Sequence, residues 1–326
     1  MKVSILMFTA RDDCPMVGYP NIHMFEYLMA SLRKQTYKNF EVVIADVIHD
    51  RRPNYFKEHP EKFDVIHIPV KPNVWTPKGY IAISTTKNTC LLHATGDVVI
   101  FVGDCTSLEP TLIEVGLKKL EKVDYVYTAY ESRLGDTFRG YMINPHHPIS
   151  HGHSGLTAKI ELLEELNGYD EKYDGARGYE DCDIAIRLAA KGTTVDFNTL
   201  LMRHQIHKDF PTIKNYLRCS YPWHNYRTKT IRQQKSFRVN DKITDEEFNI
   251  LADKCAFVDE KKKCITFSKV TGKEIICPHN GNIDKRNDEN FKDVYLYKNP
   301  SLTFDLKEQR KNVDETLKEL KKLVEE

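Results

Sequence analysis

The stretch Gly96-Asp-Val-Val-Ile-Phe-Val-Gly-Asp104 has the pattern of a strand in the interior of a parallel sheet. Its five consecutive apolar residues leave no polar face, which is typical of strands that are covered on both sides. We therefore predict a strand over residues 97–102, followed by an acid, Asp104. Ligands of open parallel sheets bind beyond the carboxyl ends of the strands, so Asp104 is a candidate binding residue.

Similar apolar runs come earlier in the chain, and segments with helical spacing separate them. Strands are predicted over residues 3–9, 40–46 and 64–70, and helices over residues 24–35 and 83–93. This alternation predicts right-handed crossovers and a mainly parallel sheet with helices on both faces. Thr9, Arg11 and Asp46 would then lie at the same edge as Asp104, although acids at strand ends are also common in simple turns.

A second informative stretch is Gly178-Tyr-Glu-Asp-Cys-Asp183, which places Glu180 and Asp181 at the start of an amphipathic helix. Ile184 and Leu188 lie on one helical face with Asp181 one turn before them, so Asp181 is predicted to point toward a cleft. A general base is expected at such a place. The alternative is a structural role, because acids in a first turn also stabilise a helix through its dipole.

The composition is that of a soluble globular protein. The 326 residues carry a net charge of +1, with 40% hydrophobic and 29% charged residues, so no global attraction to nucleic acid or membrane is expected. The N-terminus lacks the pattern of a signal peptide, and no apolar run reaches membrane-spanning length, which predicts a cytoplasmic protein. The eight cysteines are then expected to be free thiols.

Several segments resemble, in this order, the family 2 glycosyltransferases, which have the GT-A fold. They are residues 3–9, 32–46, 87–88, 96–104, 166–171 and 178–187. The resemblance covers residues 1–210 and implies a Rossmann-like domain that binds a nucleotide sugar and carries the catalytic residues. Residues 211–326 would form a mixed, mostly helical C-terminal extension at the acceptor side or at an oligomer interface.

The resemblance also implies roles for single residues. The residues expected to bind the donor are Thr9, Arg11, Asp46, Lys87, Asn88, Gly103 and Asp104. The Asp46 carboxylate would accept a hydrogen bond from the ring N–H of uracil or thymine. Lys87 stands where the family often has an arginine, near the donor sugar or its phosphate. Asp181, beside Glu180, matches the catalytic base, which takes the proton of the acceptor hydroxyl in a single inverting displacement.

The chain departs from the family pattern at the metal site, where Gly103-Asp104-Cys105 replaces Asp-X-Asp. Asp104 is then the one remaining oxygen ligand, because Mn²⁺ and Mg²⁺ prefer oxygen to the thiol of Cys105. The resemblance still implies a Mn²⁺ or Mg²⁺ ion held by Asp104, the diphosphate and His204, with His207 as a further candidate. The alternative is that both histidines are ordinary strand residues.

Two regions are candidates for acceptor binding. One is the loop that carries His146, His147, His151 and His153, which borders the acceptor in the resembling family. Its prolines and glycines indicate a flexible loop, so the four histidines do not have the fixed spacing of zinc ligands. Residues 214–238 mix basic and aromatic side chains, which suits a phosphorylated or nucleic-acid acceptor. Both regions also have plain alternatives, a solvated loop and a helix packed on the catalytic domain. The single residues proposed to contact the acceptor are His153, Tyr179, Trp223 and Arg227.

The end of the chain has the pattern of an amphipathic helix. Its apolar face consists of Val313, Leu317, Leu320 and Val324. Such a face predicts a docking or dimerising helix, and hence a candidate homodimer. Upstream, the gaps between Cys255, Cys264, Cys277 and His279 are irregular, so a zinc site there is only a weak alternative.

The sequence as a whole favours an inverting glycosyltransferase that uses a UDP-sugar or a related nucleotide sugar. The acceptor class stays open between a glycan, a lipid-linked sugar, a protein and a nucleic acid. A non-catalytic nucleotide-sugar-binding or scaffold protein is the main alternative, because the metal motif is degenerate. A nucleotidyltransferase is disfavoured, because the chain lacks a glycine-rich phosphate loop near its N-terminus.

Overall fold

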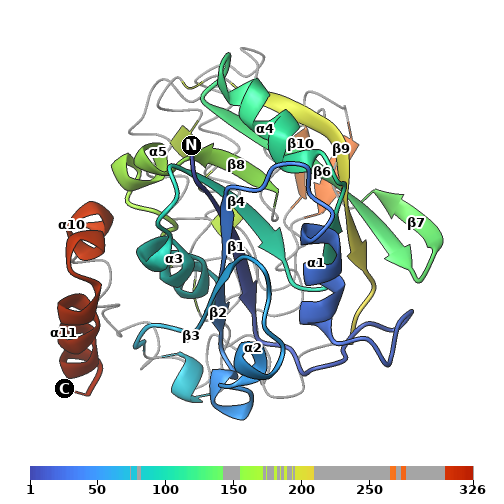
Figure 1. Ribbon diagram of the computed structural model, residues 1–326. Coiled ribbons are helices and arrows are strands. Elements are labelled where there is room, and N and C mark those ends of the chain that lie inside the picture. The colour runs from blue at the N-terminus through green and yellow to red at the C-terminus, as the bar shows by residue number, and fades with distance from the viewer. Residues whose placement is uncertain are drawn as a thin grey trace.

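The protein is described here by a computed structural model (Figure 1). It describes residues 1–73, 75–78, 82–141, 155–171, 174, 180–181, 184, 187–188, 193, 195–208, 265–268, 273–276 and 305–325. The strands are β1 (Val3–Thr9), β2 (Phe40–Asp46), β3 (Asp64–Pro69), β4 (Val98–Gly103), β5 (Thr106–Leu108), β6 (Tyr125–Leu134), β7 (Thr137–Tyr141), β8 (Leu156–Lys159), β9 (Val195–Gln205), β10 (Ile265–Ser268) and β11 (Lys273–Ile276). The helices are α1 (Met24–Leu32), α2 (Tyr55–Glu58), α3 (Ile83–His93), α4 (Leu112–Leu120), α5 (Ile160–Glu165), α10 (Leu306–Lys311) and α11 (Val313–Glu325), with short 3₁₀ turns at His49–Arg51 and Thr76–Lys78.

The main sheet has a parallel half and a mixed half. Within the described residues its order is β3-β2-β1-β4-β8-β6-β9-β5, and β7 pairs with β6 (Figure 1). Strands β3, β2, β1 and β4 are parallel, as predicted, whereas β8 runs antiparallel to both β4 and β6. The α/β fold and the parallel strands are thus confirmed, and the antiparallel strands are additional to the prediction.

The predicted helix over residues 24–35 ends earlier, at Leu32. Its last predicted residue, Gln35, follows a turn at residues 33–34, and its side-chain amide donates to the carbonyl of Glu109 at 2.7 Å. The following Thr36 donates its main-chain N–H to Pro110 O at 2.9 Å. These contacts fasten the chain to the segment after β5, so the helical pattern stops there.

Each central strand contributes to two separate cores, one on each face of the sheet. In β4, Val98, Ile100 and Val102 belong to the core under α1 and α4, whereas Val99 and Phe101 belong to the core under α3 and α5. Successive side chains of a strand point to opposite faces, so a strand without polar positions fills both cores. This burial explains the continuous apolar run of the sequence.

The carboxyl ends of β1, β2 and β4 meet at one edge of the sheet. The register pairs Thr9 with Asp46 across β1 and β2, and Phe8 with Gly103 across β1 and β4. Asp104 follows β4 directly. The predicted common edge is therefore present, and it carries the polar residues that the sequence singled out.

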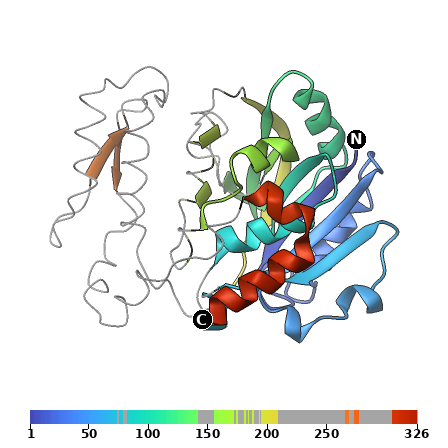
Figure 2. The ribbon, with the colours of Figure 1, turned by 90° about the vertical axis from the view of Figure 1, so that its left-hand side faces the viewer.

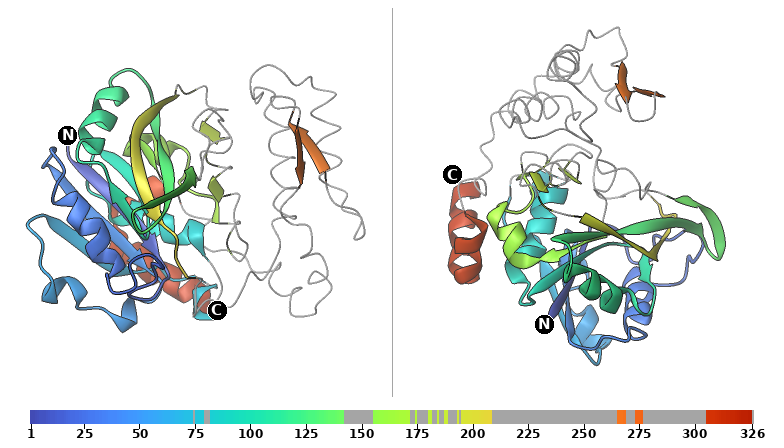
Figure 3. Two further views of the ribbon diagram at one scale, coloured as in Figure 1. Left: turned by 90° about the vertical axis from the view of Figure 1, so that its right-hand side faces the viewer. Right: turned by 90° about the horizontal axis from the view of Figure 1, so that it is seen from above.

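The two C-terminal helices pack on the same chain. Leu306 is 3% exposed and belongs to the core under α3 and α5, and Arg310 Nε lies 2.7 Å from Glu164 Oε1 of α5. Leu320 is fully buried on the predicted apolar face of α11. Figure 2 shows both helices on the side of the domain that faces the viewer, where α10 packs on α3 and α5, and Figure 3 shows them at the end of the domain opposite β7. The docking half of the prediction is confirmed, and dimerisation stays a prediction.

The rest of the predicted C-terminal extension lies mostly outside the described residues. Between residues 209 and 304, the structure describes only the antiparallel pair formed by β10 and β11. The boundary at residue 210 and the mostly helical character of the extension therefore stay predictions. In the described part of the chain, no helix is long and apolar enough to cross a membrane.

Leu306→Ala tests whether α10 is part of the domain. The change leaves a cavity in the core, so we expect the free energy of unfolding in urea to fall by about 2 to 5 kcal/mol. The matched control is Leu323→Ala, because Leu323 is 43% exposed on α11 and should change stability by less than about 0.5 kcal/mol. Equal effects of the two variants would contradict the docking of α10.

Candidate active site

Lys87 of α3 is a buried cation that holds the acid pair of the site. Its side chain is 1% exposed, its ammonium donates to a carboxylate oxygen of Asp181, and it lies 3.3 Å from Glu180 Oε1. The ammonium also stands over the rings of Phe8 and Tyr169, at 4.9 and 4.5 Å from their centroids. Burial lowers the pKa of Lys87, but Asp181 and Glu180 outweigh it, so the pKa lies above its ordinary value and the group is charged.

Asn88, the next residue of α3, fastens the segment that precedes the acid pair. Its side-chain Nδ2 donates to Tyr169 O and its Oδ1 accepts from Tyr169 N, both at 2.8 Å. A Cβ at Gly168, where φ is +65°, would come within 2.5 Å of Asn88 Oδ1, so this close contact requires glycine. Asn88 thus positions a backbone, and its predicted contact with the donor stays a prediction.

Two further buried acids hold the start of α3. Asp174 accepts from the N–H groups of Ser84 and Thr85 at 2.8 and 3.0 Å, which caps a helix whose N-cap residue, Ala82, has no polar side chain. The Thr85 hydroxyl lies 2.9 Å from Glu171 Oε2 and 2.5 Å from Asp174 Oδ2. Burial and the neighbouring Glu171 raise the pKa of Asp174 well above its ordinary value, although the hydrogen bonds from Thr85 and Ser84 oppose this.

Asp104 is paired with an arginine. Its Oδ2 accepts from Thr9 Oγ1 at 3.0 Å, and Arg11 Nε lies 3.1 Å from Oδ1 and 3.0 Å from Oδ2. Burial raises the pKa of Asp104, but Arg11, His207 and His204 outweigh this effect. The pKa of the carboxyl therefore lies below its ordinary value, and the carboxyl is ionised at neutral pH. The preceding residue, Gly103, ends β4 and donates its N–H to the Tyr130 hydroxyl at 3.3 Å.

His204 and His207 lie close enough to Asp104 to lower the pKa of its carboxyl. His204 pairs with Thr106 in the β5–β9 ladder, and its Nδ1 lies 3.2 Å from Thr106 Oγ1. The two imidazole rings are 5.0 Å apart between centroids. Burial lowers the pKa of His207, although Asp104 acts in the opposite direction, so the ring is neutral near neutral pH.

These residues do not form a metal site by themselves. No three His, Cys, Asp or Glu side chains in the described ranges are grouped so that they could hold an ion. Cys105 adopts a left-handed φ of 57°, and its buried side chain belongs to the core under α1, where burial raises the pKa of the thiol. The Asp104 carboxylate is already bound by Arg11 and Thr9. Joint binding of a metal by Asp104, His204 and a diphosphate stays a prediction.

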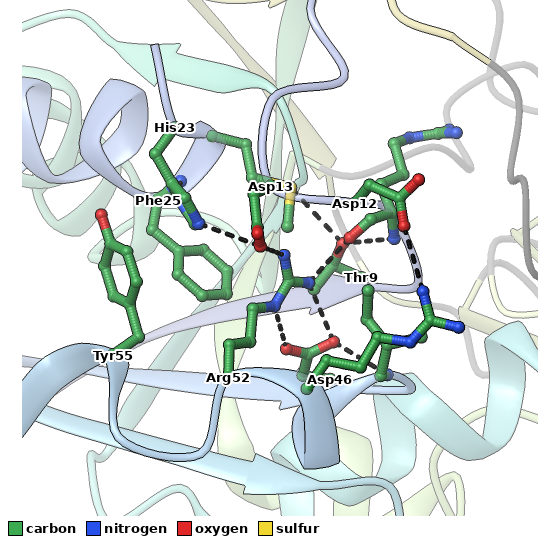
Figure 4. Close-up of polar contacts among 12 residues, drawn as sticks. Thr9, Asp12, Asp13, His23, Phe25, Asp46, Arg52 and Tyr55 are labelled. Atoms are coloured by element: carbon green, nitrogen blue, oxygen red, sulfur yellow. Dashed lines mark hydrogen bonds and ion pairs between the residues drawn. The ribbon is translucent and has the colours of Figure 1, made fainter. Parts of the chain in front are cut away.

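Asp46 is the centre of a hydrogen-bond network (Figure 4). It is fully buried, and Arg52 binds both its oxygens through Nε at 2.7 Å and Nη2 at 3.0 Å. His67 Nε2 and the main-chain N–H of Ile48 complete the set, each at 3.0 Å. Burial raises the pKa of Asp46, but His67 and Arg52 outweigh it and hold it below its ordinary value. Asp46 therefore binds other groups of the protein, and its predicted contact with a nucleotide base stays a prediction.

Arg52 connects this network to the loop after β1 (Figure 4). Its Nη2 donates to Arg11 O at 2.8 Å and its Nη1 lies 2.9 Å from Asp13 Oδ1. His23 caps α1 by accepting from Phe25 N at 3.1 Å, and its other ring nitrogen lies 3.3 Å from the same Asp13 oxygen. Burial lowers the pKa of His23 to about 4, so the ring is neutral.

The sequence did not assign a role to several residues that organise the site. They are Lys71, Arg52, Glu171 and Asp174. Lys71 Nζ lies 2.5 Å from Glu171 Oε1, one hundred positions along the chain, and both side chains are buried. Only the motif at 166–171 pointed to this part of the site, and it gave no role to Glu171. The candidate acceptor residues His153, Tyr179, Trp223 and Arg227 lie outside the described residues, as do the other histidines of that loop and Cys255, Cys264, Cys277 and His279.

Comparison with solved structures identifies the fold. The chain is similar to Staphylococcus aureus TarS 1-349 in complex with UDP-GlcNAc, with a TM-score of 0.53 at 13% identity over 78% of this chain and 70% of that one. It is also similar to a longer S. aureus TarS structure, with a TM-score of 0.50 at 13% identity over 78% of this chain but only 42% of TarS. At this identity the likeness shows the fold, which is GT-A. No protein-family model and no curated protein matches the chain.

Asp174→Asn tests the state of the buried acid that caps α3. A carboxyl whose pKa is raised by folding adds stability below its ordinary pKa of 3.8, and this stability is lost as pH rises through the raised value. The difference in unfolding free energy, wild type minus Asp174→Asn, should therefore fall as pH rises above about 4 in urea titrations. Asp174→Ala, which also removes the acceptor, should be about 1 to 3 kcal/mol less stable than Asp174→Asn at every pH. A difference that stays constant or grows with pH would refute this state of Asp174.

Proposed function

We propose that the protein is an inverting glycosyltransferase that moves a sugar from a UDP-sugar to an acceptor hydroxyl. One observation carries the proposal: in a GT-A fold, Asp181 lies buried against Lys87 at the place where the sequence predicts a general base. The TarS 1-349 structure with the same fold contains UDP-GlcNAc, which supports a nucleotide sugar as the donor.

The charges at the acid pair suit proton transfer. Glu180 and Asp181 carry two formal negative charges, and the Lys87 ammonium beside them carries one positive charge. The three groups sum to −1, so the pair can accept a proton without building up positive charge in a buried place. In the proposed step the acceptor oxygen bonds to the anomeric carbon and gives its proton to Asp181. The bond from that carbon to the diphosphate oxygen breaks, and UDP leaves.

The edge formed by Thr9, Arg11 and Asp104 is where we place the diphosphate of the donor. These residues follow the carboxyl ends of β1 and β4, the side on which open α/β sheets bind ligands. Main-chain and side-chain contacts already fix Arg11 there, because Arg52 binds its carbonyl and Asp104 binds its guanidinium. A fixed cation stabilises a leaving diphosphate without reorganisation during the reaction.

Asp181→Asn tests the general base. The change keeps the shape and removes basicity, so we expect transfer to fall by a factor of about 10² or more while UDP affinity stays within about twofold. Transfer is measured by release of UDP in the presence of candidate acceptors, and UDP affinity is measured by calorimetry. Glu180→Gln is the matched control and should lose less activity. Wild-type transfer by Asp181→Asn would refute the assignment, and UDP binding without any turnover of the wild-type protein would favour a binding protein instead.

Asp46→Asn tests a contribution of Asp46 to donor binding through Arg52. Since Arg52 binds both carboxylate oxygens of Asp46, we expect the change to loosen Arg52 and the loop at Arg11, and to weaken the binding of UDP and CDP alike, by about tenfold. Calorimetry with both nucleotides gives the ratio. Asp50→Asn, at an exposed position next to the same network, should bind both as the wild type does. A loss confined to UDP would instead show that Asp46 contacts the uracil ring directly.

A further inference from the structure

Arg11 is paired with the carboxylate of Asp104, which a metal ion at this site would need as a ligand. The resemblance leads one to expect two acids after β4, but the chain has Asp104 followed by a cysteine whose side chain lies in the core. The single carboxylate is 10% exposed, and Arg11 Nε lies within 3.1 Å of both its oxygens. A guanidinium carries a permanent positive charge, so this pair persists across the whole physiological pH range.

The position of Arg11 is fixed at both its main chain and its side chain. Its N–H donates to Thr9 Oγ1 at 3.2 Å, and its carbonyl accepts from Arg52 Nη2 at 2.8 Å. Its Nη1 donates to Lys208 O at 3.2 Å, next to the end of β9 that carries His204. The cation is therefore held between β1, β4 and β9 rather than lying on the surface.

We propose that Arg11 is the resident cation of this site and takes the place of a divalent metal in binding the diphosphate. The proposal rests on the proposed function, because it names the group that recognises the diphosphate of the donor. Arg11 and a divalent ion compete for the same carboxylate, and two cations at one acid repel each other. The wild-type protein should then bind UDP without metal, and removal of Arg11 should open Asp104 to Mn²⁺.

The first experiment measures UDP affinity by calorimetry in EDTA and in Mn²⁺. For the wild type we expect dissociation constants that agree within about twofold between the two conditions. Arg11→Gln should weaken UDP binding by about tenfold or more in EDTA and recover part of the loss in Mn²⁺. Arg11→Lys keeps the charge and should bind at an intermediate level in EDTA. If the wild-type protein needs Mn²⁺ to bind UDP, the proposal is overturned. This comparison uses only the wild-type protein, so it does not depend on the folding of any variant.

The second experiment measures Mn²⁺ binding without nucleotide, by electron paramagnetic resonance. We expect Arg11→Gln to bind Mn²⁺ at least about tenfold more tightly than the wild type, and Asp104→Asn added to that variant to abolish the gain. Equal Mn²⁺ affinity of the wild type and Arg11→Gln would overturn the competition. This arm does not involve UDP, so it still decides the role of Arg11 if UDP does not bind and the proposed function fails. Thermal unfolding of each variant confirms that it is folded.

Discussion

The buried ammonium of Lys87 is the interaction on which the geometry of the site depends. Taking a charge out of water is costly, and the cost is offset only where carboxylates with good geometry meet it. Asp181 and Glu180 supply them, from a part of the chain more than ninety residues away. The acid pair is thereby fixed against α3, and the rings of Phe8 and Tyr169 exclude water around the ammonium.

The same arrangement recurs along the edge of the sheet, where acids at strand ends face buried arginines. Asp46 meets Arg52, and Asp104 meets Arg11. The two pairs are joined by the hydrogen bond from Arg52 Nη2 to Arg11 O. Each acid holds a guanidinium in a fixed position before any ligand arrives. Such preorganised charge is what a site needs in order to stabilise an anionic leaving group.

Much of the fold could be predicted from the sequence, because three of the parallel strands, β1, β2 and β4, are mostly apolar. These strands are buried on both faces, so each contains a run of apolar residues. Such a run can be recognised in the sequence without knowing which strands lie beside it. β6 carries Thr128, Glu131 and Ser132 among its aromatic residues, and besides the adjacent β7 it pairs with β8 and β9, which come from later parts of the chain. No local pattern encodes the pairing of β6 with β8 and β9, so the mixed half of the sheet was not predicted.

The candidate site divides in the same way. Asp104 and Asp181 could be singled out as candidates from the sequence, because Asp104 follows a buried strand and Asp181 lies at the start of a predicted amphipathic helix. Glu171 and Asp174 act through contacts across long stretches of chain, as Asp174 does with Ser84 ninety positions earlier, and Arg52 joins the nearby Asp46 to the more distant Arg11. Their residue types suit the surface of any soluble protein, and only burial distinguishes them.

Helix α3 shows how distant segments serve the site, because both its ends are satisfied by other parts of the chain. At its N-terminus, Asp174 accepts from Ser84 N and Thr85 N. At its C-terminus, Arg310 of α10 donates to Leu91 O, one of the carbonyls that a helix leaves unsatisfied. A cation there also suits the negative end of the helix dipole. The C-terminal helices thus support the same helix that carries Lys87, which links the end of the chain to the position of the acid pair.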